Sequence, residues 1–239
     1  FDKNGTTLIM YPEAKVGDYV VPDGVETIQQ YAFDSCYGLT SISMPASLAL
    51  IQSHALIRLT NLEFILFQGD APICDEYWYG LMNESLVIYY YEGAANFTSP
   101  TWYDIISIAL SAPSAPVLVS AIVDGLKVDL VWTAPSSDGN STITGYKVFF
   151  GTVTPNAQYG SILSNGVTNL TVTGLEADTT YHFAVKAVND IGESELSNVM
   201  NATPVTDDEG SSPTIIIVFV VVIAVAVAAI TVWWLRFKK

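Results

Sequence analysis

Basic residues are scarce in this sequence. Its 239 residues include 9 Lys and Arg against 24 Asp and Glu, which gives a formal net charge of -15. Proteins that bind nucleic acid neutralise phosphates with clustered Lys and Arg, so this balance argues against a nucleic-acid partner. Charged residues of both signs make up 14% of the chain and apolar residues 50%, whereas an ordinary soluble domain has about 25% charged residues. High hydrophobicity argues against general disorder, so the chain is expected to fold.

Motifs for catalysis, phosphate binding and metal binding are missing as well. The sequence contains no G-x-S-x-G, no GxxxxGK[ST], no GxGxxG and no HExxH. Its two histidines, His54 and His182, lie far apart in the sequence, which makes a shared metal ion a weak hypothesis. We therefore expect a protein that is not an enzyme and that uses no cofactor and no metal ion.

Cysteine is also rare, with Cys36 and Cys74 the two in the chain. An exported chain permits a disulfide between two cysteines. A buried thiol can instead pack as a small apolar side chain. The sequence leaves open whether these two cysteines pair.

Long apolar runs are confined to the C-terminus. Residues 214–235 read TIIIVFVVVIAVAVAAITVWWL, without charge, proline or glycine. A helix of that length measures about 33 Å, enough to cross a hydrocarbon core of about 30 Å. Three of the nine basic residues follow at 236–239, and all 24 acidic residues precede the run. The positive-inside rule then predicts a cell-membrane protein with one transmembrane helix at 214–235, a linker at 205–213, a basic cytoplasmic tail at 236–239 and an extracellular N-terminal region.

Sequons agree with this predicted topology. Asn-X-Ser/Thr occurs on the predicted outer side more often than the roughly two occurrences expected by chance. The candidate glycosylation sites are Asn4, Asn83, Asn96, Asn140, Asn169 and Asn201. The alternative is that loops and strand edges are simply rich in Asn, Ser and Thr. The chain starts at Phe1 without an export signal, so we also expect an upstream segment of unknown length.

The first half of the sequence repeats every 23 residues, since residues 21–42 align with residues 44–65 at that single offset. The matching pairs are Pro22 and Pro45, Val25 and Leu48, Ile28 and Ile51, Ala32 and Ala55, Phe33 and Leu56, Leu39 and Leu62, and Ile42 and Ile65. A third copy is predicted at an offset of 24, which aligns residues 62–67 with residues 86–91. A period of about 20 to 29 residues with an L-x-x-L-x-L core is typical of leucine-rich repeats, which stack to bury their apolar faces.

One copy of the repeat carries a family motif. The sequence PDGVETIQQYAFDSCYGLTSISMP at residues 22–45 resembles the BspA-like leucine-rich repeat of microbial surface proteins, with its pattern P-x-x-V-x-x-I-x-x-x-A-F-x-x-C-x-x-L-x-x-I. The resemblance covers roughly residues 1–104, and we assign residues 1–110 to this N-terminally truncated region and its C-terminal cap. Leu56 and Leu59 replace the Phe and Cys of the motif in the second copy. The resemblance implies surface attachment by non-covalent binding and supplies no catalytic residues.

The strand pattern of the repeat predicts a binding face. If Leu39, Ile42 and Met44 point inward, then Ser41 and Ser43 point outward. The outward positions of the next two copies are then apolar, at Phe64, Leu66, Ile88 and Tyr90. We predict that these four side chains form an exposed patch that binds a partner. The alternative is that the cap or the neighbouring domain covers them.

The second half changes to short alternating strands separated by turns, as in an all-β sandwich. The segments TAPSSDGNSTITGYKV at 133–148 and GLEADTTYHFAVKAVNDIGESELSN at 174–198 resemble a fibronectin type III domain, which we assign to residues 111–204. Under this resemblance Trp132 and Tyr146 are core aromatic residues. Tyr181 then occupies the tyrosine corner, where its hydroxyl bonds to the backbone.

The sequence as a whole therefore predicts a mainly β protein, with a short leucine-rich-repeat solenoid, a fibronectin type III sandwich and one transmembrane helix. The predicted function is that of a membrane-anchored cell-surface binding or adhesion protein. Its solenoid would recognise an extracellular protein or glycan, and the type III domain would serve as a spacer. Two alternatives stay open, a structural stalk or the anchor of an enzyme whose catalytic domain lies upstream of residue 1.

Overall fold

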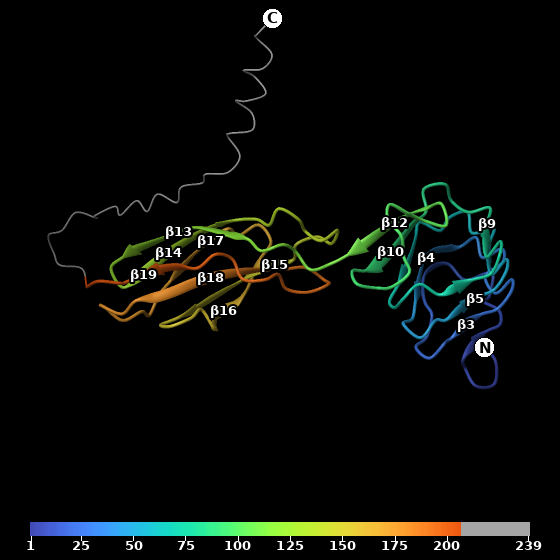
Figure 1. Cartoon of the computed structure of the whole chain (residues 1–239), viewed down its shortest axis with the longest axis horizontal. Helices are drawn as coiled ribbons and strands as arrows, with labels where there is room; N and C mark the ends of the chain where they lie inside the picture. Colours follow the sequence, from blue (N-terminus) through green and yellow to red (C-terminus); the bar gives the residue numbers. More distant parts are fainter. Residues whose placement is uncertain (207–239) are drawn as a thin grey trace, which may run out of the picture.

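The structure is a computed structural model that describes residues 1–206 as two all-β units, a solenoid and a sandwich (Figure 1). The transmembrane helix predicted at 214–235 and the tail at 236–239 lie outside the described residues. Across residues 1–206, no helix has the length and apolar character needed to cross a membrane.

The solenoid is built from twelve strands in three sheets. The strands are β1 (Thr7–Leu8), β2 (Gly17–Val20), β3 (Thr27–Ile28), β4 (Leu39–Met44), β5 (Leu50–Ile51), β6 (Leu56–Ile57), β7 (Phe64–Phe67), β8 (Ile73–Cys74), β9 (Tyr79–Gly80), β10 (Val87–Tyr91), β11 (Thr101–Trp102) and β12 (Ile105–Leu110). The largest sheet has the order β11-β12-β10-β7-β4-β2, the second β1-β3-β5-β8, and the third pairs β6 with β9. All pairs are parallel except that of β11 with β12.

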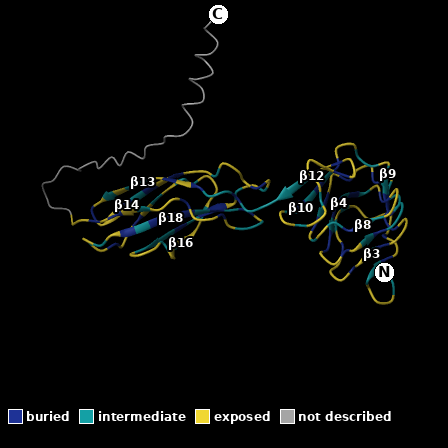
Figure 2. Cartoon of the chain, viewed as in Figure 1, coloured by how far each residue is buried: buried dark blue, intermediate teal, exposed yellow. Residues whose placement is uncertain are grey.

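Parallel pairing fixes the repeat at 23 residues through three successive turns. Ile42 lies opposite Ile65, and Ile65 lies opposite Ile88. All three side chains are fully buried, each with 0% of its surface exposed. Equivalent side chains therefore stack along the solenoid and form a continuous core that no single turn could enclose. Figure 2 shows buried residues in dark blue within the solenoid.

The structure corrects the predicted alignment of the third copy. β10 pairs with β7 at an offset of 23 rather than 24, so that Val87 lies opposite Phe64. The offset of 24 came from matching Leu86 to Leu62, and both of these leucines are indeed buried. Leu86, however, precedes the strand and does not set its register.

This shift reverses the orientation of two predicted face residues. Ile88 and Tyr90 point into the core, with 0% and 8% of their surface exposed, so the prediction that they face outward was wrong. The physical reason is the two-residue period of a strand, because a slip of one residue exchanges the two faces. Phe64 and Leu66 do lie on the outer side of β7, with Phe64 37% exposed.

The inward positions of the first two copies agree with the sequence. Leu39, Ile42 and Met44 are fully buried. Leu56 and Leu59, which replace the Phe and Cys of the motif, are fully buried as well. These substitutions therefore keep the core apolar.

Aromatic side chains close the C-terminal end of the solenoid. The Tyr90 and Phe97 rings stack with their centroids 4.5 Å apart and their planes at 11°. Trp102 lies 4.9 Å from Phe97 and 5.6 Å from Trp78 between ring centroids. Aromatic pairs of this kind contribute about 0.5 to 1.5 kcal/mol each beyond the burial of their area. The cluster therefore caps a core that would otherwise end at water.

The sandwich packs a three-stranded sheet, β13-β14-β17, against a four-stranded sheet, β16-β15-β18-β19. Its strands are β13 (Val117–Asp124), β14 (Lys127–Thr133), β15 (Gly145–Gly151), β16 (Ala157–Ser164), β17 (Asn169–Val172), β18 (Tyr181–Val188) and β19 (Met200–Ala202). Trp132 and Tyr146 meet in the core with ring centroids 5.7 Å apart, as predicted. The Tyr181 hydroxyl accepts a hydrogen bond of 3.2 Å from the Glu176 N–H, which confirms the tyrosine corner.

Hydrogen bonds from Asn189 and Asn140 hold residues 109–111, which connect the two units, against the loops of the sandwich. We call this set of hydrogen bonds the joint. The amide nitrogen of Asn189, whose side chain is buried, donates to the carbonyl oxygens of Ser111 and Asp138 at 2.8 Å. The Asn140 amide nitrogen donates to the Ala109 carbonyl oxygen, also at 2.8 Å. Asn189 thus satisfies carbonyl groups of two separate segments from one buried position.

Both cysteines are free thiols in the structure. Cys36 is fully buried, and burial together with the charges of Glu13 and Asp34 raises the pKa of its thiol to about 11. Burial, with the charge of Asp75, raises the pKa of Cys74 to about 12. The structure therefore favours packing over pairing at both positions.

Thiol labelling tests this arrangement. A raised pKa leaves about one Cys36 thiol in a thousand ionised at pH 8, and the thiolate is the species that reacts with alkylating reagents. We expect the native chain to label at least about a hundredfold more slowly than free cysteine. Unfolding without reductant should expose two reactive thiols. Recovery of no reactive thiol until a reductant is added would indicate a disulfide instead.

Replacing Asn189 tests the hydrogen-bonded joint. Asn189→Ala removes the buried amide that donates to the carbonyl oxygens of Ser111 and Asp138, which should lower the free energy of unfolding of the sandwich by about 2 kcal/mol. Urea denaturation of residues 1–206 measures this change. Asn165→Ala is the control, because Asn165 is exposed and should change stability by less than about 0.5 kcal/mol. Equal stabilities of the two variants would contradict the role of the joint.

Candidate binding face

Apolar side chains cover the outer side of three neighbouring strands of the largest sheet, β7, β10 and β12. Alternate residues of each strand point away from the core, and here those positions are apolar in all three strands. We call these eight side chains the apolar face: Phe64, Leu66, Val87, Tyr89, Tyr91, Ile106, Ile108 and Leu110.

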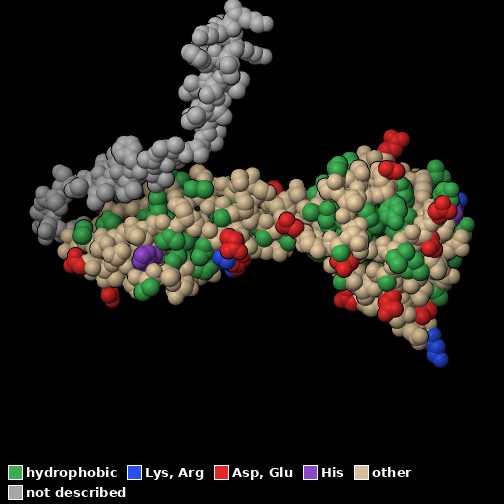
Figure 3. Space-filling view, viewed as in Figure 1, with side chains coloured by type: hydrophobic (Ala, Val, Ile, Leu, Met, Phe, Trp, Pro, Cys, Tyr) green, Lys and Arg blue, Asp and Glu red, His purple; other side chains and the backbone are tan. Residues whose placement is uncertain are grey.

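The parallel pairing of β7, β10 and β12 aligns the side chains of the apolar face in rows across the strands. One row runs from Phe64 through Val87 to Ile106, and the next runs through Tyr89. The Phe64 and Tyr89 rings meet edge to face, with centroids 5.8 Å apart and planes at 75°. Phe64 and Ile106 are exposed, at 37% and 53%, and the other members are half-buried. Figure 3 shows hydrophobic side chains gathered on the solenoid surface, with Asp and Glu among them.

The N-terminal side of the same sheet is polar. Ser41 and Ser43 occupy the outward positions of β4. The Asp18 carboxylate accepts hydrogen bonds from the hydroxyls of Ser41, at 2.7 Å, and Thr40, at 2.8 Å, and these bonds lower the pKa of Asp18. The outer surface of the sheet therefore changes from polar to apolar in the direction of the cap.

Of the four predicted face residues, the structure places two outward and two in the core. Phe64 and Leu66 belong to the apolar face, whereas Ile88 and Tyr90 belong to the core. The outward positions of β10 and β12 are occupied instead by Val87, Tyr89, Tyr91, Ile106, Ile108 and Leu110. Continuing the offset of 23 residues from the first two copies would have found the β10 residues. No equivalent signal exists for β12, because Ile88 pairs with Ser107 at an offset of only 19.

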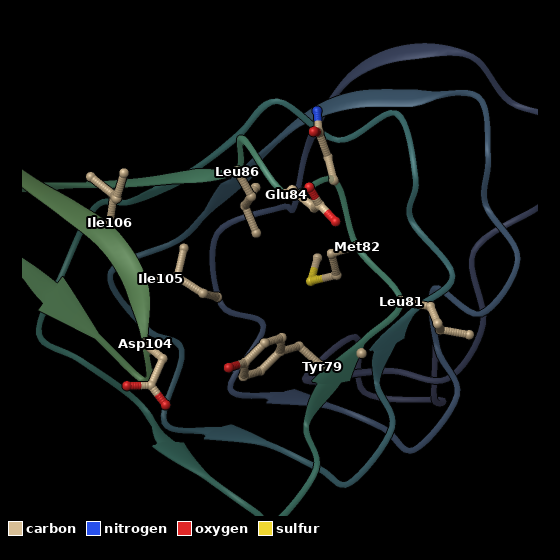
Figure 4. A pocket seen from close by; sticks show the side chains of 10 residues that line it. Tyr79, Leu81, Met82, Glu84, Leu86, Asp104, Ile105 and Ile106 are labelled. Atoms are coloured by element: carbon tan, nitrogen blue, oxygen red, sulfur yellow. The ribbon is translucent and has the colours of Figure 1, made fainter.

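A small pocket of about 250 Å³ opens beside the apolar face, where β10 and β12 begin (Figure 4). Met82, Leu86 and Ile105 supply apolar walls, and Glu84 and Asp104 supply carboxylates. Figure 4 shows the Tyr79 ring near Asp104, with Met82 and Glu84 on another side of the opening. Burial raises the pKa of the Tyr79 hydroxyl, and the charge of Asp104 raises it further. That hydroxyl donates to the Tyr103 carbonyl oxygen at 2.6 Å.

The candidate glycosylation sites differ in their surroundings. Five of the six are exposed: Asn4, Asn96, Asn140, Asn169 and Asn201. Asn140 uses its amide nitrogen in the joint, which is the atom that a glycan would modify. Asn83 is half-buried in the wall of the pocket, and its side-chain oxygen accepts a hydrogen bond of 3.0 Å from the Ser85 N–H. Use of these sequons stays a prediction.

Neither histidine has metal-binding surroundings. The His54 ring lies between Tyr31 and Tyr77, with centroids 5.5 Å and 6.2 Å away. His182 lies on β18, half-buried, in the other unit. Among residues 1–206, no group of three or more His, Cys, Asp and Glu side chains is placed to hold a metal ion. The apolar face and the pocket beside it are features of the described chain that suggest a binding site.

Comparison with curated proteins finds similar segments in proteins of much greater length. Exoglucanase A of Cellulomonas fimi is 42% identical over 79 residues, which cover 32% of this chain and 8% of that protein. Chitinase D of Niallia circulans is 38% identical over 96 residues, which cover 40% of this chain and 16% of that protein. The chain therefore spans less than a fifth of the length of either relative.

The chain is also similar to part of a solved structure and matches two family models. The twitchin kinase region from C. elegans is 23% identical, with a TM-score of 0.38, over 44% of this chain and 18% of that one. Residues 10–94 match the family model described as BspA type Leucine rich repeat region (6 copies), and residues 111–203 match the Fibronectin type III domain. The chain thus carries a BspA-type leucine-rich repeat region followed by a fibronectin type III domain, as its sequence motifs predicted.

Proposed function

We propose that this chain is a membrane-anchored cell-surface protein that binds a protein partner through the apolar face of its solenoid. The two domain types suggest a surface or binding protein. The observation that carries the proposal is the continuous row of outward apolar side chains on three adjacent strands. Soluble proteins rarely leave large contiguous apolar patches in water unless something binds there.

The chemistry of the apolar face favours a protein over a glycan. A glycan presents many hydroxyl groups, and each one loses hydrogen bonds to water when it is covered by carbon. Six of the eight side chains carry no polar atom, and Tyr89 and Tyr91 add one hydroxyl each. A protein segment with aliphatic or aromatic side chains matches such a surface without leaving polar groups unpaired. A glycan partner is thus an alternative outcome of the binding test.

Membrane anchoring is the second part of the proposal. The apolar run at 214–235 and the basic residues at 236–239 support it. The type III domain would then act as a spacer between the bilayer and the solenoid. The hydrogen bond from Asn140 to the Ala109 carbonyl oxygen suits that role, because it ties the last strand of the solenoid to a loop of the sandwich.

A structural stalk is the second candidate, and the same joint favours it. A stalk needs a fixed connection between its units but no exposed binding surface. An enzyme anchored through this chain is a further alternative, in which catalysis would belong to other residues. We propose that the described residues themselves carry no enzyme activity.

Substitution on the apolar face separates binding from a stalk role. Phe64→Ser with Tyr89→Ser removes the two aromatic rings that meet edge to face. Because buried aromatic anchors contribute about 2 kcal/mol or more to an interface, binding should weaken at least about tenfold. Binding of fluorescent residues 1–206 to cells and to a panel of matrix proteins measures the effect.

The matched control is Tyr31→Ser with Tyr77→Ser, which removes two exposed rings from another part of the solenoid. We expect this control to bind as the parent chain does. Thermal unfolding of both variants checks that the fold is retained. Unchanged binding after loss of Phe64 and Tyr89 would exclude the apolar face as the site and leave the stalk.

A further inference from the structure

We propose that the partner presents a lysine or arginine next to apolar residues, and that this basic side chain enters the pocket between Glu84 and Asp104. The apolar neighbours of that side chain would cover the apolar face. This inference rests on the proposed function, because it specifies the chemistry of the partner for the same surface.

The pocket and the apolar face form one continuous surface. Ile106 belongs to both, since it lines the pocket and lies in the first row of the apolar face. Because β7, β10 and β12 are parallel, their first residues lie along one edge of the sheet. Glu63, Glu84 and Asp104 all precede these strands closely and so border that edge. A bound segment that covers the apolar face would therefore pass along a row of carboxylates.

The solenoid as a whole attracts cations. Residues 1–110 include 13 Asp and Glu against 3 Lys and Arg, a net charge of -10. Arg58 is already engaged in an ion pair with Asp34. The ion pairs found within residues 1–206 involve neither Glu84 nor Asp104, so both carboxylates are available to a partner's charge. The negative electrostatic potential of such a surface raises the association rate of a basic partner and lowers that of an acidic one.

The dimensions and walls of the pocket fit one long basic side chain. Its volume of about 250 Å³ lies below the range of about 300 to 1,000 Å³ that is typical for small-molecule sites. Lys and Arg have apolar stems and charged ends, which match a pocket lined by Met82 and Leu86 together with the carboxylates of Glu84 and Asp104. The Tyr79 ring adds an aromatic surface of the kind that attracts cations.

Glycosylation of Asn83 would interfere with this site. Asn83 lines the pocket, and Ser85 completes its sequon. A glycan on Asn83 would stand at the opening that the basic side chain must enter. The binding experiment therefore uses chain made in a host that adds no glycans.

Peptide binding by the full 239-residue chain in mild detergent tests the inference. The probes are short synthetic peptides of aliphatic and aromatic residues with one central Lys, Arg, Gln or Glu. We expect the Lys and Arg peptides to bind at least about tenfold more tightly than the Gln peptide. The preference should shrink as salt is raised, because salt screens the carboxylates.

Two variants separate this inference from the proposed function. Glu84→Gln with Asp104→Asn keeps the shape of the pocket but removes its charge, and should abolish the Lys and Arg preference while binding of the Gln peptide persists. Asp75→Asn with Glu76→Gln makes the same change in net charge at exposed positions elsewhere and should keep the preference.

The outcomes are distinct. If all peptides bind the parent chain equally, the proposal that a basic side chain enters the pocket is wrong. The same conclusion follows if the Lys and Arg preference survives Glu84→Gln with Asp104→Asn. Neither result contradicts binding at the apolar face. Binding that is unchanged in Phe64→Ser with Tyr89→Ser overturns the apolar face as well. Absence of binding to every peptide counts against both proposals.

Discussion

The parallel ladder that joins β4, β7 and β10 is the constraint on which the solenoid depends. It holds each residue beside its equivalent 23 positions along the chain, as Ile42, Ile65 and Ile88 illustrate. A strand has two faces, so this register decides at once which side chains stack in the core and which face water. The core and the apolar face are therefore products of the same hydrogen bonds. Neither can shift without the other.

Packing in the core limits which amino acids can occupy the inward positions of the strands, whereas the outward positions are much less limited. Inward positions must be apolar and of matching size, because interiors are close-packed. Outward positions are free to differ, and along one row they change from Ser41 to Phe64, Val87 and Ile106. A repeat protein can in this way alter its binding surface from turn to turn without altering its core. The apolar character of this row near the cap is therefore not required by the packing of the core.

The sequence predicted the features that depend on local pattern and missed those that depend on register or long-range contact. Both domain types, the inward Leu39 and the Tyr181 corner followed from motifs and alternation. Ile88 was misplaced because Leu86 offered an apolar match to Leu62 at an offset of 24, whereas the strand keeps the offset of 23 found in the first two copies. The pocket was not predicted, since Glu84 and Asp104 line one opening only when parallel strands bring their starting points together. The Asn189 joint depends likewise on carbonyl groups distant in the sequence.

The acidic charge of the solenoid and its apolar face are best understood together. An exposed apolar surface tends to associate with its own copies, and two copies of this chain would offer each other the same eight side chains. Each copy also brings a border of carboxylates that includes Glu63, Glu84 and Asp104, and like charges brought together oppose that contact. A basic partner meets no such opposition and gains from both the apolar contact and the charge. The same carboxylates would thus keep the apolar face open in the absence of a partner and select the partner that closes it.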